Sequence, residues 1–139
     1  MRLRRPAKYP FINLLAACAW SQDKPRSAFD FARLGTEIQG RWLERLVAQE
    51  LWRRRCIQGE QIPELLPYWQ GGEHELDFVL GPGMYIEVKR GQASPVEFAW
   101  FPRAFAKARL LVVSASRFQT ESIQGITFED FLSSEELPV

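Results

Sequence analysis

The chain has 139 residues, enough for one domain with a hydrophobic core of its own, and it is 46% hydrophobic and 25% charged, as ordinary globular proteins are. Its net charge of +1 does not by itself predict polyanion binding. Two distant cysteines, one histidine and no GxxxxGK[ST] motif exclude a disulfide scaffold, the usual zinc frameworks and a P-loop, and they are typical of a cytoplasmic protein.

The charges are unevenly distributed along the chain. Residues 1–55 carry 12 Lys and Arg against 5 Asp and Glu, whereas residues 56–139 carry 6 against 12. This distribution fits a phosphate-facing surface beside a cation site, and it equally fits a solvated helix followed by an acidic tail.

The first part of the chain is predicted to be helical. After a basic arm over 1–10, the apolar stretch "FINLLAACAW" (11–20) is expected to form a buried helix, since it is too short to span a bilayer and lacks the flanks of a signal peptide. A break at 21–27 precedes apolar residues at helical spacing over about 33–56, where Gly40 suggests close packing. We therefore expect an N-terminal arm and short helix over 1–26 and a domain over 27–139.

Two hairpins are predicted next, because Gly71-Gly72 and Gly81-Pro82-Gly83 join three strand-like runs. In "HELDFVL" (74–80), taken as one strand, alternation places Asp77 on one face and Leu76 with Phe78 on the other. In "MYIEVKR" (84–90), Glu87 and Lys89 share a face.

The last third of the chain predicts a crossover to further strands. Ser94, Pro95 and Glu97 form a capping-box pattern that predicts a helix over 95–108, kinked at Pro102. "RLLVVSAS" (109–116) is a continuous apolar strand, expected to lie parallel to 84–90 through a right-handed crossover. "GITF" predicts another strand and "FEDFL" a short helix. The order predicts an α/β fold with a mixed sheet flanked by helices.

The turn around residue 82 should bring two carboxylates and an amine together. Counting outward from its centre pairs Asp77 with Glu87, and directly opposed residues share a face with Cβ atoms about 5 Å apart. Like charges so placed are destabilising unless a cation neutralises them, and oxygen ligands suit Mg²⁺ or Mn²⁺. For Glu87 and Lys89 alone, the alternative is a surface ion pair.

An Asp, nine residues and then Glu-x-Lys at the end of an apolar strand resemble the signature of the PD-(D/E)xK nuclease superfamily, which has the restriction-endonuclease-like fold. The resemblance implies that Asp77, Glu87 and the carbonyl of Val88 hold the metal, and that Lys89 orients or activates the attacking water. It also implies a catalytic glutamate on the preceding helix, where Glu44 matches and Glu50 is the reserve candidate.

A narrower resemblance covers roughly residues 8–130. "GRWLERLVAQEL", "YWQGGEHELDFVL" and "YIEVKRG" are similar to the uncharacterised C-terminal domain of a family of prokaryotic AAA-type ATPases, here without the ATPase domain. The expectation is a Mg²⁺-dependent nuclease acting on nucleic acid, DNA being the first candidate. The alternatives are a catalytically silent module that binds nucleic acid or a separate AAA-type ATPase, and an assembly domain that forms a homo-oligomer. No segment predicts a membrane span.

Other candidate residues have two interpretations each. Arg41 and Arg45, one turn apart on the helix of Glu44, are candidates for phosphate contacts or members of a solvated helix face. His74 and Glu75 are expected to be solvated rather than ligands. Three aromatic residues are expected to pack in the core, although they could also stack on bases: Trp69, Trp100 and Phe101.

Overall fold

The computed structural model describes residues 13–59 and 66–136. They belong to two compact units, a helical unit within residues 9–65 and a sheet unit within residues 66–139, and each is described by itself. Within the described ranges, no helix is long and apolar enough to cross a membrane. The predicted basic arm lies outside these ranges, and the domain boundary after residue 26 stays a prediction.

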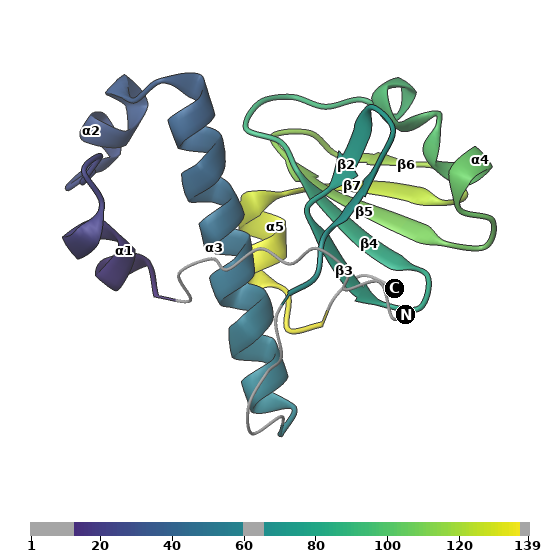
Figure 1. The fold of residues 1–139 in the computed structure, drawn as a ribbon, viewed down its shortest axis with the longest axis horizontal. Helices are drawn as coiled ribbons and strands as arrows, with labels where there is room; N and C mark the ends of the chain where they lie inside the picture. Colours follow the sequence, from purple (N-terminus) through teal and green to yellow (C-terminus); the bar gives the residue numbers. More distant parts are fainter. Residues whose placement is uncertain (1–12, 60–65, 137–139) are drawn as a thin grey trace. The chain divides into compact units, whose positions relative to one another are not determined.

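The helical unit contains, over residues 13–59, α1 (Leu14–Trp20), α2 (Ala28–Arg33) and α3 (Thr36–Ile57) (Figure 1). Side-chain caps begin the two short helices: Asn13 accepts a hydrogen bond from the Ala16 N–H, and Ser27 accepts one from the Asp30 N–H. The sequence analysis did not predict α2, because six residues carry little periodic signal.

Two expectations for the helical unit are wrong. Within the stretch 11–20, whose first two residues lie outside the described ranges, α1 is not a buried helix, because it buries only Ala17 and leaves 82% of both Leu15 and Trp20 exposed. Gly40 does not mark close packing either, since a Cβ atom built there meets no described neighbour within 4 Å. An apolar composition and a lone glycine do not by themselves define a buried face.

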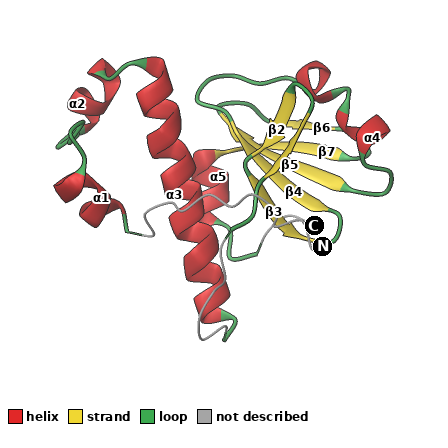
Figure 2. Ribbon diagram, viewed as in Figure 1, coloured by secondary structure: helices red, strands yellow, loops and turns green. Residues whose placement is uncertain are grey.

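The sheet unit contains a two-stranded and a five-stranded sheet (Figures 1 and 2). β1 (Trp69–Gly71) pairs antiparallel with β2 (His74–Leu76). The larger sheet has the order β3-β4-β5-β7-β6, with β4–β5 and β5–β7 parallel and the outer pairs antiparallel. Its strands are β3 (Phe78–Gly81), β4 (Met84–Val88), β5 (Arg109–Ser114), β6 (Phe118–Gln119) and β7 (Ile123–Thr127).

This architecture confirms the α/β class and the mixed sheet. The predicted parallel alignment of 84–90 with 109–116 is also confirmed, since Glu87 pairs with Val112 in the β4–β5 ladder. The first three residues of "GITF" belong to β7, and "FEDFL" begins α5 (Phe128–Ser133), which packs against β5 and β7. The two-residue β6 was not predicted, because so short a strand carries no alternation.

The β3–β4 hairpin has the predicted register. Phe78 pairs with Ile86 and Val79 with Tyr85, so the turn is centred at residue 82. Gly83 in this turn has φ 79°, a left-handed conformation that a side chain would disfavour. The pairing shifts between Val79 and Gly81, which is a β-bulge beside the turn.

The segment 74–80 is not the single strand that alternation predicted. The chain bends at Asp77, so β2 and β3 belong to different sheets. Leu76 therefore does not share the face of Phe78 but joins an aromatic cluster on the other side. The bend residue Asp77 accepts the Val88 N–H through its side chain at 2.8 Å, a tertiary contact that period-two alternation cannot anticipate.

The predicted helix over 95–108 is also wrong in extent. The structure has a 3₁₀ helix, η1 (Pro95–Phe98), and then α4 (Phe101–Ala104), with Phe105 as its C-cap. Pro102 lies at the start of α4, where its missing N–H costs no helical hydrogen bond, so it begins a second helix instead of kinking the first. The capping box of Ser94 and Glu97 is confirmed.

An aromatic cluster covers one face of the larger sheet. It combines buried residues of β5 and β7 with η1, α4 and the β1–β2 hairpin, and Trp69, Tyr85, Trp100 and Phe105 pack against it. Phe101 has no exposed surface, and Trp69 and Trp100 are half-buried and stacked on each other. The three aromatic residues that were candidates for base stacking are thus packed in this cluster, as expected.

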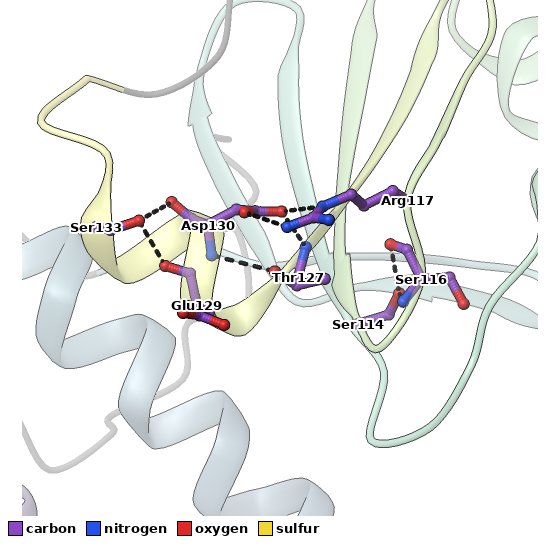
Figure 3. A network of polar contacts seen from close by, with 7 residues as sticks. All are labelled: Ser114, Ser116, Arg117, Thr127, Glu129, Asp130 and Ser133. Carbon is purple, nitrogen blue, oxygen red and sulfur yellow. Dashed lines mark hydrogen bonds and ion pairs between the residues drawn. The ribbon is translucent and has the colours of Figure 1, made fainter.

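The start of α5 is fixed by polar contacts (Figure 3). Thr127 and Asp130 form a capping box, and Arg117 binds both Asp130 carboxylate oxygens at 2.7 Å. The hydrogen bond and charge of Arg117, together with Thr127, hold the pKa of Asp130 below its ordinary value. These contacts join the end of β7 to the segment that follows β5.

Gly125→Ala is expected to lower the free energy of unfolding by about 1–3 kcal/mol, because the new Cβ atom would lie 2.4 Å from the Phe118 ring. Gly40→Ala is the matched control and should instead raise stability by about 0.5–1 kcal/mol, since its Cβ meets open space within a helix. Urea unfolding of both variants checks the pair. Equal stability of Gly125→Ala and wild type would show that the Phe118 ring moves away from the new Cβ atom without a cost in stability.

Candidate active site

Asp77, Glu87 and Val88 are brought together at the end of the β3–β4 pairing. Asp77 is the bend residue before β3, while Glu87 and Val88 are the last two residues of β4. The register that pairs Phe78 with Ile86 places Asp77 opposite Glu87. All three are buried, with exposed fractions of 6, 7 and 9%. The predicted carboxylate pair therefore exists, and it lies inside the protein rather than on its surface.

A buried hydrogen bond joins Asp77 to β4. The Val88 N–H donates to Asp77 Oδ2 at 2.8 Å. Because the N–H and C=O groups of one strand residue point to the same edge, the Val88 carbonyl is on the Asp77 side of β4. The three predicted ligand groups thus lie at the same strand end.

Lys89 completes the group from the solvent side. Its Nζ atom lies 2.6 Å from Glu87 Oε1, and its side chain is 41% exposed. Its backbone N–H donates to the Val113 carbonyl at 2.9 Å, which extends the β4–β5 ladder by one residue beyond β4. The ion pair expected as the simpler alternative is therefore real, but it is joined to a second, buried carboxylate.

Glu87 has an electrostatic cost that its ion pair does not remove. Its Oε2 atom is buried and has no hydrogen-bond partner among the described residues. Burial and the negative charge of Asp77 raise the pKa of Glu87 to about 7, although Lys89 acts in the opposite direction. An unsatisfied buried acceptor typically costs about 1–3 kcal/mol, and such costs are concentrated at functional sites.

Lys89 remains a cation in this environment. Its burial disfavours the charged form, but the hydrogen bond and charge of Glu87, helped by Asp77, outweigh that effect and raise the pKa of Lys89. An ammonium group that keeps its proton can orient an oxygen nucleophile or bind a phosphate oxygen. It is a poor general base, so the geometry favours a positioning role.

The donor groups fit a hard divalent cation. Among the residues that the structure describes, no group of three or more His, Cys, Asp or Glu side chains forms a metal cluster. The candidate set is instead two carboxylates, Asp77 and Glu87, with the Val88 carbonyl, and Glu87 Oε2 is the oxygen that lacks a partner. An all-oxygen set of this size suits Mg²⁺ or Mn²⁺, which keep several water ligands.

The helix residues predicted for the site belong to the helical unit. Glu44 is half-buried on α3, and its catalytic role stays a prediction. Glu50, the reserve candidate, is buried and binds both neighbouring arginines: Arg53 through two hydrogen bonds and Arg54 through one, all at 2.7 Å. The hydrogen bond to Arg53 is the largest influence that lowers the pKa of Glu50. These contacts give Glu50 a structural role within α3.

The predicted phosphate contacts also lie on α3. Arg41 is exposed and lies 3.6 Å from Glu37, a weak surface pair. The Arg45 guanidinium lies 4.8 Å from the centre of the Trp42 ring. Both interpretations of these arginines, phosphate contact or solvated helix face, remain open.

His74 and Glu75 lie on β2 in the small sheet, and both are exposed, as expected. The His74 ring is stacked on Trp100, with ring centres 4.1 Å apart and planes at 4°. This contact gives His74 a packing partner that the sequence analysis did not predict. A cavity of about 110 Å³ lies at the opposite end of the strands, where Met84 and Arg109 begin β4 and β5, so it does not contain the carboxylates.

Sequence reasoning missed Phe98 beside Lys89. Its buried ring lies 6.0 Å from Lys89 Nζ. The capping box of Ser94 and Glu97, which was recognised in the sequence, is the signal that could have placed Phe98 at the end of a helical turn.

Comparisons of the chain with family models, curated proteins and solved structures found no match.

Glu87→Gln is expected to stabilise the protein at pH 8 and to have little effect at pH 5. A carboxyl with a raised pKa contributes stability that is complete below pH 4.5 and is lost as the pH rises through about 7. Since each tenfold change in proton affinity is worth about 1.4 kcal/mol, the loss in wild type approaches roughly 3 kcal/mol. Glutamine does not titrate and avoids this loss.

Urea unfolding at both pH values measures the difference. Asp130→Asn is the control of opposite sign: it should destabilise the protein at both pH values, because Arg117 holds that carboxyl in its ionised form. If the difference in unfolding free energy between Glu87→Gln and wild type is the same at both pH values, Glu87 does not lose stability by ionising in a buried position.

Proposed function

We propose that the chain is a Mg²⁺-dependent nuclease-like protein that hydrolyses phosphodiester bonds of nucleic acid. The observation that carries the proposal is the buried pair Asp77 and Glu87 beside the Lys89 ammonium, in which one carboxylate oxygen has no hydrogen-bond partner in the described part of the chain. Packing alone gives no reason to keep this arrangement, because Lys89 binds only one oxygen of Glu87 and the repulsion between two buried carboxylates destabilises the fold.

The proposed roles follow from the contacts of each residue. Asp77 and Glu87, with the Val88 carbonyl, would hold the metal. The chemistry supplied by Mg²⁺ at such a site is neutralisation of phosphate charge and activation of water. Lys89, held against Glu87 Oε1 and still charged, would orient the attacking water or the phosphate. Glu44 as a catalytic residue, and Arg41 and Arg45 as phosphate contacts, all on α3 of the helical unit, are proposed from the sequence alone.

The proposed fold is the restriction-endonuclease-like one. The five-stranded mixed sheet, the β3–β4 hairpin and the parallel β5 support this assignment, since Asp77 directly precedes β3 and Glu87 is next to the last residue of β4. The proposed substrate is DNA, and a separate AAA-type ATPase is a proposed partner. The alternative is a silent module of the same fold that binds nucleic acid or that partner without cutting.

Wild-type protein is expected to cut DNA in the presence of Mg²⁺ or Mn²⁺, and EDTA should abolish the cutting. Asp77→Asn, Glu87→Gln and Lys89→Met should each lower the rate at least about 100-fold, since each removes a group that contacts the metal or the reacting phosphate. Gel assays of single-stranded, double-stranded and circular DNA measure the activity. Asp130→Asn, purified in parallel, removes an ion pair elsewhere in the sheet unit and should cut like wild type.

Equal cutting by wild type and the three site variants would indicate a contaminating nuclease. No cutting by any protein, together with DNA binding that survives Asp77→Asn, would favour the silent module.

Metal binding is expected to occur without any substrate. Mn²⁺ should raise the melting temperature of wild type, because a ligand that binds only the folded state stabilises it. Asp77→Asn and Glu87→Gln should lose this rise while remaining folded, whereas Asp130→Asn should keep it. Thermal unfolding with and without millimolar Mn²⁺ provides the measurement, and an equal rise in all four proteins would place the ion elsewhere.

A further inference from the structure

The Lys89 ammonium is close to two side chains from different segments. Glu87 Oε1 is 2.6 Å from Nζ, and the centre of the Phe98 ring is 6.0 Å from it. Phe98 is 4% exposed, whereas the Lys89 side chain is 41% exposed. A half-exposed lysine normally samples several rotamers, so attraction to both neighbours restricts where its charge can lie.

The chain between Lys89 and Phe98 is held at its beginning by backbone hydrogen bonds to the end of β5 and the residue after it. The Lys89 N–H donates to the Val113 carbonyl at 2.9 Å, and the Ala115 N–H donates to the Gly91 carbonyl at 2.9 Å. These bonds hold the segment after β4 alongside the end of β5. The backbone of Lys89 is therefore fixed by the sheet, and only its side chain remains to be positioned.

Two further hydrogen bonds, both from backbone N–H groups to side-chain oxygens, hold the same segment just before η1. The Ala93 N–H donates to Ser116 Oγ at 3.1 Å, and Ser116 itself is held because its N–H donates to Ser114 Oγ at 3.0 Å (Figure 3). The Ser94 N–H then donates to Glu97 Oε1 at 2.8 Å in the capping box that begins η1.

We infer that Phe98 is a positioning residue of the proposed active site, which holds the Lys89 ammonium against Glu87 for the reaction. The inference rests on the proposed function. A buried ring face attracts a cation without accepting its proton and without occupying its hydrogen-bond donors. Two Lys89 donors thus remain available for water or phosphate while the first binds Glu87. A third carboxylate in the place of Phe98 would use one of these donors.

The test compares Phe98→Met with Phe101→Met. Both residues are buried in the same aromatic cluster, and methionine keeps most of the apolar volume but lacks the ring. Phe98→Met is expected to lower kcat at least about fivefold with an unchanged KM. Phe98→Tyr, which keeps an aromatic ring at this position, should have the kcat of wild type. Phe101→Met should leave kcat within about twofold of wild type. Melting temperatures show that all variants fold.

A second readout needs no activity. In metal-free wild type, NMR should show the Lys89 ε-methylene protons shifted upfield by the Phe98 ring, with the assignment made by their absence in Lys89→Arg. Phe98→Met should remove this shift, and Phe101→Met should not. If Phe98→Met does not fold, Phe98→Leu, which also keeps most of the apolar volume and lacks the ring, should lower kcat and remove the shift in its place.

The outcomes are distinguishable. Equal kcat and equal Lys89 shifts in the two methionine variants would overturn the inference while leaving the nuclease proposal intact. A wild type that cuts no substrate would overturn the nuclease proposal and, with it, the catalytic role of Phe98. In that case, a Lys89 shift that is lost in Phe98→Met would still establish that the ring holds the ammonium. A Lys89 shift that is the same in Phe98→Met and wild type would refute this contact.

Discussion

Asp77 and Glu87 face each other because β3 and β4 pair around a turn centred at residue 82, and the other contacts of the site depend on this pairing. The pairing brings Asp77 within hydrogen-bond distance of the Val88 N–H. It also leaves Lys89 one residue beyond the strand, where its side chain can return to Glu87. A change of register by one residue would move Glu87 to the opposite face of the sheet and separate it from Asp77.

The energetic cost of the carboxylate pair is offset by the packing around it. Glu87 shares a sheet face with Val112, which is fully buried, and with the aromatic cluster formed by η1, α4 and the β1–β2 hairpin. This apolar cover excludes water and raises the pKa of Glu87, so the same packing that stabilises the unit makes its acidic residue costly. A protein that keeps such a residue gives up stability at the place where we propose that it acts.

Local rules predicted part of the fold correctly. The hairpin register followed from a Gly-Pro-Gly turn, the capping box from Ser94 and Glu97, and the buried parallel β5 from a continuous apolar run. The predictions that failed needed information from elsewhere in the chain. Asp77 is a bend between β2 and β3, and its side chain accepts the N–H of Val88, eleven residues away. The predicted helix after Pro95 divides because Pro102 begins a second one.

The sequence by itself determined that Asp77, Glu87 and Lys89 would meet, since spacing and turn chemistry define a hairpin without reference to any other part of the protein. Only the tertiary structure decided the burial and the hydrogen-bond partners of these side chains and the pKa values of Glu87 and Lys89. It buried both carboxylates, left Glu87 Oε2 without a partner among the residues of 13–59 and 66–136, and brought the Phe98 ring to Lys89. Burial and electrostatics depend on what packs around a group, and those neighbours come from segments whose positions no local pattern contains.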